Sequence, residues 1–82
     1  MLSVCQIKSA RAILGWSAAD LAEKSGVGAT TLRRYEMGSG LPNANVKTLQ
    51  AIKSTFEDAG VEFLGDPLVN PGVMLHLKLG VV

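Results

Sequence analysis

The segment from Ser17 to Gly38, SAADLAEKSGVGATTLRRYEMG, contains two short stretches of helical periodicity separated by a glycine turn. In the first stretch Leu21 would face the interior, and in the second Leu32 and Tyr35 stand at i and i+3 on one side. Gly26 ends the first stretch, because glycine adopts the left-handed backbone conformation at no steric cost. Two helices joined by so short a turn cross steeply, and the pattern therefore predicts a helix-turn-helix.

Helical periodicity continues on both sides of this segment. Residues 3–14 predict a helix capped by Ser3 and ended by Gly15, and residues 45–59 predict a helix capped by Asn45. We expect Trp16 to be a core wedge between the first helix and the next. The expected buried stripes are Val4, Ile7, Ala10, Ile13 and Leu14 in the first helix, and Val46, Leu49, Ile52, Phe56 and Ala59 in the last.

After Gly60 the period changes from helical to alternating. Residues 61–64, VEFL, and 73–82, VMLHLKLGVV, flank a loop rich in proline and glycine, which predicts a β-hairpin or one strand with an extended tail. The fold class expected is therefore mainly α, with a helix-turn-helix domain over 1–60 and a hairpin or strand over 61–82. An isolated hairpin is marginal in water and has open edges, so 61–82 either pairs with a second copy to form a homodimer or covers the helical core.

Composition narrows the possible functions. An 82-residue chain with 48% apolar and 18% charged residues is expected to form one compact domain rather than a disordered chain. The chain has one cysteine, Cys5, expected to be buried, and one histidine, His76, so it offers no zinc set and no catalytic triad. We expect no enzyme activity, catalytic residue, metal, cofactor or small-molecule effector. No signal peptide or membrane-spanning run is apparent, which favours a cytoplasmic, nucleoid-associated protein.

Charge is distributed unevenly along the chain. Residues 1–54 hold seven basic and three acidic side chains, a net charge of +4, whereas residues 55–82 hold one basic and four acidic side chains, a net charge of −3. A polyanion is therefore expected to approach the first part of the chain.

The second helix of the helix-turn-helix has the side chains needed to contact double-stranded DNA. Small residues at its start allow close approach to base edges, and an arginine one turn further on can form a bidentate contact with guanine. The predicted base contacts are Ala29, Thr30 and Arg34, and the predicted backbone contacts are Ser17, Thr31, Arg33 and Lys47. We interpret Glu36 as the partner in a local ion pair or cap rather than a DNA contact.

The stretch ARAILGWSAADLAEKSGVGATTLRRYEMG resembles the phage-repressor or Xre-like helix-turn-helix family, which includes the Cro and CI proteins. The matching marks are LGWS, Leu21-Ala22, Ser25-Gly26-Val27, Thr31-Leu32, Tyr35-Glu36 and Gly38. The resemblance implies a lambda-repressor-like domain of four or five helices in a prokaryotic transcription regulator, usually a dimer on a two-fold operator. It places the groove-facing positions of the family at Ala29, Thr30 and Arg34.

Two departures from the family pattern leave an alternative open. Ala18 stands where the family often has glutamine, and Gly28-Ala29 stand where larger polar side chains are common. Base readout would then depend on Thr30, Arg34 and DNA shape. The principal interpretation is a sequence-specific DNA-binding regulator, in particular a repressor. The alternative is a protein-interaction module of the antitoxin type, with weak or no DNA binding.

Overall fold

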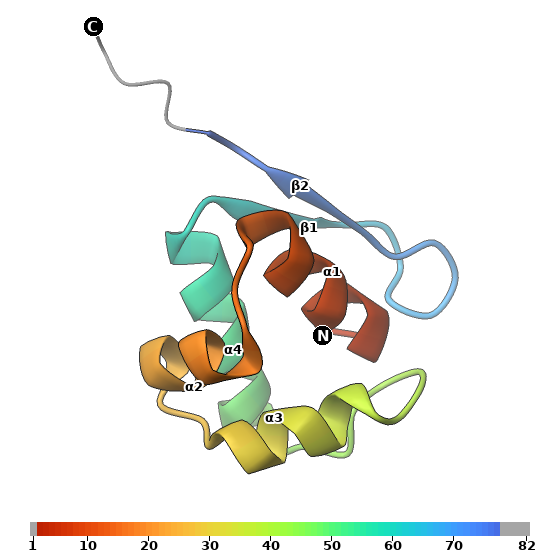
Figure 1. Ribbon diagram of the computed structural model, residues 1–82. Helices are drawn as coiled ribbons and strands as arrows, with labels where there is room; N and C mark the ends of the chain where they lie inside the picture. Colours follow the sequence, from red (N-terminus) through yellow and green to blue (C-terminus); the bar gives the residue numbers. More distant parts are fainter. Residues whose placement is uncertain (1, 78–82) are drawn as a thin grey trace, which may run out of the picture.

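The computed structural model describes residues 2–77 and contains four α-helices followed by a two-stranded antiparallel hairpin (Figure 1). The expected order and type of the elements are confirmed. The elements are α1 (Val4–Leu14), α2 (Ala18–Ser25), α3 (Ala29–Glu36), α4 (Val46–Asp58), β1 (Val61–Leu64) and β2 (Gly72–Leu75). The part of the predicted second strand from 78 onward lies outside the described residues.

Local capping explains where the helices begin and end. The Ser3 and Ser17 side chains accept hydrogen bonds from the backbone N–H groups three residues later. In turn, the side chains of Gln6 and Asp20 accept hydrogen bonds from the backbone N–H groups of Ser3 and Ser17. Such reciprocal boxes satisfy donors that the first turn of a helix otherwise leaves unpaired. Gly26 ends α2 with φ of 76°, a left-handed conformation that leads directly into α3.

The hairpin packs against the helices and shares their core. β2 contacts α1, β1 contacts α4, and Val61 is buried with the helical side chains. In Figure 1 the two strands lie at the end of the molecule opposite α3. Gln6 of α1, which is 2% exposed, links α1 to both strands of the hairpin. Its Nε2 donates to the carbonyls of Leu64 and Gly72, each at 3.3 Å.

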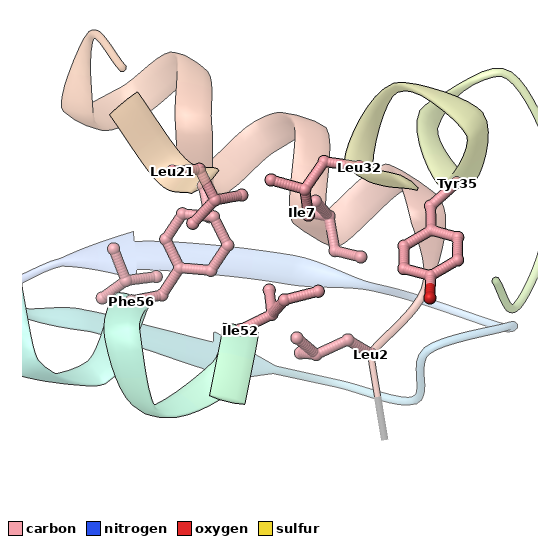
Figure 2. Close-up of a cluster of buried hydrophobic side chains, with 9 residues drawn as sticks. Leu2, Ile7, Leu21, Leu32, Tyr35, Ile52 and Phe56 are labelled. Carbon is pink, nitrogen blue, oxygen red and sulfur yellow. The ribbon is translucent and has the colours of Figure 1, made fainter. Parts of the chain in front are cut away.

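One hydrophobic cluster joins all four helices and β1 (Figure 2). Phe56 is fully buried and stacked on Trp16, with ring centroids 5.8 Å apart. Trp16 packs against this cluster as expected of a core residue, but its ring contacts are with Phe56 of α4 and Lys24 of α2 rather than between α1 and α2. The members of the cluster are Leu2, Ile7, Ala10, Leu21, Leu32, Tyr35, Ile52, Phe56 and Val61.

Three burial expectations are wrong. Ile13 is 44% exposed, because Leu14 packs against the core at the end of α1 in its place. Val46 is 67% exposed, because the first turn of α4 extends past the core, which α4 reaches fully only at Ile52. Cys5 is exposed, since it lies between the buried positions Val4 and Gln6 on the opposite side of α1.

Candidate nucleic-acid interface

Helix α3 presents an exposed stripe opposite its buried side. Leu32 and Tyr35 are buried, whereas Thr30, Arg33 and Arg34 are exposed. With about 100° of rotation per residue, Thr30 lies about 10° from the direction opposite the buried pair. Arg34 lies about 40° from Thr30 on one side, and Arg33 about 60° from it on the other. The stripe therefore carries two guanidinium groups flanking a line of uncharged side chains.

The structure places the other predicted contact residues around this stripe or at neighbouring helix starts. Ala29 and Thr31 are half-buried on the two flanks of α3. Lys47 is exposed in the first turn of α4, and Ser17 is the exposed N-cap of α2. Thr30, Arg33 and Arg34 thus share one helix face, while Ser17 and Lys47 come from two other elements.

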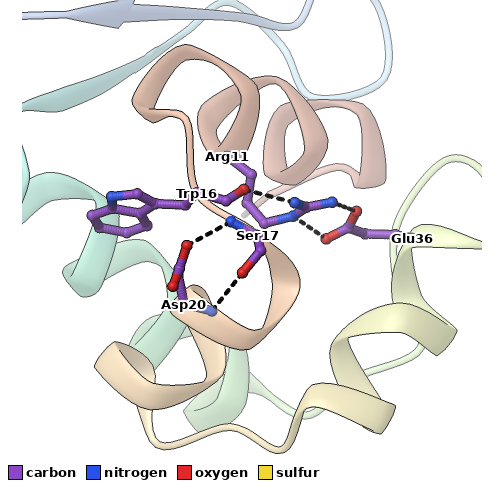
Figure 3. Close-up of polar contacts among 5 residues, drawn as sticks. All are labelled: Arg11, Trp16, Ser17, Asp20 and Glu36. Carbon is purple, nitrogen blue, oxygen red and sulfur yellow. Dashed lines mark hydrogen bonds and ion pairs between the residues drawn. The ribbon is translucent and has the colours of Figure 1, made fainter.

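Arg11 holds the end of α3 against α1 (Figure 3). Its Nε donates to Glu36 Oε2 at 2.7 Å, a second guanidinium nitrogen bonds Glu36 Oε1, and a third donates to the carbonyl of Trp16 at 2.8 Å. The Arg11 and Glu36 side chains are only 23% and 10% exposed. The hydrogen bond to Glu36 raises the pKa of Arg11 in spite of its partial burial.

This ion pair also determines the charge of the α3 surface. Glu36 is the only acidic residue of α3, and pairing with Arg11 withdraws its carboxylate from solvent. Glu36 does form an ion pair, but the expectation of a local pair is wrong, because the partner is Arg11 on α1, 25 positions away. The exposed stripe of α3 is left with two positive charges and no negative one.

The start of α2 is arranged differently from a free phosphate site. Ser17 N–H donates to Asp20 Oδ2 at 2.9 Å, and Ser17 Oγ accepts from Asp20 N–H at 3.0 Å (Figure 3). The bonds from Ser17 lower the pKa of the Asp20 carboxyl. Both the backbone N–H and the hydroxyl of Ser17 contribute to this shift, so both Ser17 donors are directed at Asp20.

Sequence reasoning missed two features of this region. The sequence does not distinguish Arg11 from an ordinary surface charge, and only the fold shows that it reaches Glu36, 25 positions away. Met37 was given no role, yet it is 87% exposed and follows α3 directly as its C-cap. Helical spacing alone would have found Met37, since it stands seven residues after Thr30 and hence on the same face.

A family model described as helix-turn-helix matches residues 7–56, which run from the first half of α1 to near the end of α4. The chain belongs to the helix-turn-helix family. The match confirms the Xre-like resemblance and the mainly helical fold class, and it identifies a DNA-binding helix-turn-helix regulator. Comparisons with curated proteins and with solved structures find no significant match.

Two other features are absent from residues 2–77. No helix there has the length and apolar character needed to cross a bilayer. The same residues contain no group of three or more histidine, cysteine, aspartate or glutamate side chains arranged to hold a metal ion.

Proposed function

We propose that this helix-turn-helix protein is a sequence-specific regulator of transcription, acting as a repressor, and that it reads double-stranded DNA with α3 in the major groove. The observation that carries the proposal is the exposed stripe of α3, where Arg33 and Arg34 flank Thr30 opposite the buried Leu32 and Tyr35. A cytoplasmic, nucleoid-associated location follows from this function, because the duplex it binds is there.

The dimensions of α3 suit the proposed groove. The major groove is about 12 Å wide and admits one α-helix with its side chains. Helix α3 has eight residues, so it is about 12 Å long and would span only a few base pairs. Readout is therefore concentrated in a few side chains, and the proposed base contacts are Ala29, Thr30 and Arg34.

Arg34 and Arg33 are assigned different tasks. Arg34 lies about 40° from Thr30 around the helix and one turn further along it, which places both over neighbouring base edges. Arg33 lies about 60° away on the other side, toward the phosphates that border the groove. Thr31, Ser17 and Lys47 complete the proposed phosphate contacts.

A homodimer through residues 61–82 is part of the proposal. His76 N–H donates to Gly60 O at 2.8 Å, and hydrogen-bonded and non-hydrogen-bonded pairs alternate along an antiparallel ladder. Val73 and Leu75 are therefore in non-hydrogen-bonded pairs, and their backbone N–H and C=O groups point away from β1. An edge of this kind can pair with the same edge of a second copy. Sedimentation of the full chain tests this, because the fraction of dimer rises with protein concentration. A chain that stays monomeric at the highest concentration measured would rule the dimer out.

The proposed DNA binding is tested by fluorescence anisotropy. A labelled random duplex is titrated with the full chain at low salt. The preferred operator is then selected from a pool of random duplexes. We expect binding whose logarithmic affinity falls linearly with the logarithm of salt concentration, because Arg33, Lys47 and similar groups displace counterions from phosphates. Absence of binding at micromolar protein would reject the function.

Two arginine variants distinguish a contact with a base from a contact with the phosphate backbone. Arg34→Ala should lower affinity for the selected operator by about 1–3 kcal/mol and relax one operator position. Arg33→Ala should weaken binding to the operator and to random duplex equally. The slope of log affinity against log salt concentration should fall by the amount expected for about one lost phosphate contact. An equal loss on both duplexes for Arg34→Ala would remove its assignment as a base contact.

An interaction module of the antitoxin type is the second candidate, and the hairpin loop favours it. Leu68 and Val69 are 61% and 80% exposed on a turn whose N–H groups bond Asp66 Oδ1 at 2.9 and 3.2 Å. Apolar side chains held on an ordered turn suit a protein partner. Failure of the anisotropy titration would favour this candidate over the regulator.

A further inference from the structure

Met37 occupies the most outward direction of the α3 stripe. Seven residues after Thr30, it points within about 20° of the same direction and about 10 Å further along the helix. It is 87% exposed, the largest exposed fraction among the large hydrophobic side chains of residues 2–77. Arg33 and Arg34 lie on either side of the line that joins Thr30 to Met37.

The backbone that carries Met37 is held firmly. Met37 N–H donates to Arg33 O at 3.0 Å, and Gly38 N–H donates to Tyr35 O at 3.2 Å. The preceding residue, Glu36, is bonded to Arg11 through both carboxylate oxygens. Met37 is therefore presented from a fixed position, as a specificity contact requires.

We propose that Met37 is a specificity-determining residue that contacts the C5-methyl group of a thymine in the major groove. This inference rests on the proposed function of α3. The thymine lies about three base pairs from the position that Thr30 contacts, given about 10 Å along the helix and about 3.4 Å per base pair.

The chemistry of methionine selects this target from the groups that the groove displays. Its thioether has no hydrogen to donate and accepts only weakly, so it forms no strong bond to a phosphate or to a polar base edge. The thymine methyl is the one apolar group that an unmodified base pair presents in the major groove. The flanking guanidinium groups of Arg33 and Arg34 draw the helix toward the duplex and keep the line from Thr30 to Met37 over the base edges.

The test is a scan in which each thymine of the selected operator is replaced by deoxyuridine, which lacks only the methyl group. Anisotropy is measured for the wild-type protein, Met37→Ala and Met37→Leu. At one thymine we expect the replacement to weaken the wild-type protein about fourfold, the effect of one buried methyl. Met37→Ala should bind the thymine and deoxyuridine forms equally, and Met37→Leu should retain most of the discrimination.

The control is Ile13→Ala, which removes an exposed apolar side chain from α1 and should leave the scan unchanged. The inference is overturned, with DNA binding intact, if Met37→Ala retains the wild-type pattern at every thymine. It is also overturned if Met37→Ala weakens operator and random duplex equally, which would indicate a contact with sugar. If the wild-type protein binds no duplex, the proposed function fails and this inference fails with it.

Discussion

The ion pair between Arg11 and Glu36 gives the sharpest prediction about stability. Arg11→Leu keeps an apolar side chain of similar reach but leaves the Glu36 carboxylate, 10% exposed, without its partner. It also removes the donor to the Trp16 carbonyl. An unpaired buried charge costs about 3–5 kcal/mol, and the partial exposure of Arg11 places the expected loss near the lower figure, about 3 kcal/mol.

The magnitude converts into an observable shift. For a domain of this size about 1 kcal/mol corresponds to about 4–8 °C, so Arg11→Leu should lower Tm by about 12–24 °C. Urea unfolding, followed by the fluorescence of Trp16, measures the free energy directly. Glu36→Leu should cost less, because the Arg11 guanidinium, on a side chain that is 23% exposed, tolerates the loss of its partner better than the 10% exposed Glu36 carboxylate does.

The double variant Arg11→Leu/Glu36→Leu completes a thermodynamic cycle. Because neither charge remains, it should recover about 2 kcal/mol relative to the sum of the single losses. A loss below about 1 kcal/mol for Arg11→Leu, together with a coupling energy near zero, would show that the pair behaves like an exposed surface salt bridge. The anchoring of α3 by α1 would then be wrong.

Two further predictions concern the ends of α1 and α2. The stabilisation that accompanies the lowered pKa of Asp20 is present above about pH 4 and is lost as pH falls through the lowered pKa. Asp20→Asn should therefore lower the urea midpoint at about pH 7, and its difference from the wild type should shrink as the solution is acidified below about pH 4. A difference that stays constant on acidification would contradict this. Gln6→Leu removes the donor shared by Leu64 and Gly72 and should cost about 2 kcal/mol. Hydrogen exchange should then accelerate in the hairpin more than in α2, and equal acceleration would refute a specific link to the hairpin.

Element boundaries were predictable because their causes are local. Ser3, Ser17 and Asn45 cap helices that begin at the following residue, and Gly26 ends α2 at the expected position. Each of these residues acts within four positions along the chain. Burial at helix ends was less predictable, as at Val46. Helical periodicity shows which side of a helix faces the core, but it does not show how far along the helix the core extends.

Contacts between distant residues were not predictable. The pair Arg11 and Glu36 spans 25 positions, and the bonds from Gln6 span 58 and 66 positions. Nothing in the local sequence distinguishes Arg11 from an exposed arginine. Of the candidate interface, the exposed face of α3 followed from helical spacing, whereas the removal of the Glu36 charge from that face depends on the fold.

The measurement that tests the central claim most directly is a ¹⁵N–¹H correlation spectrum of the full chain titrated with its selected duplex. If α3 enters the major groove, the amides of residues 28–37 and those of Ser17 and Lys47 should shift most, with smaller changes over β1 and in the last turn of α4. The largest shifts at the hairpin loop around Leu68 and Val69, with α3 unchanged, would contradict the account.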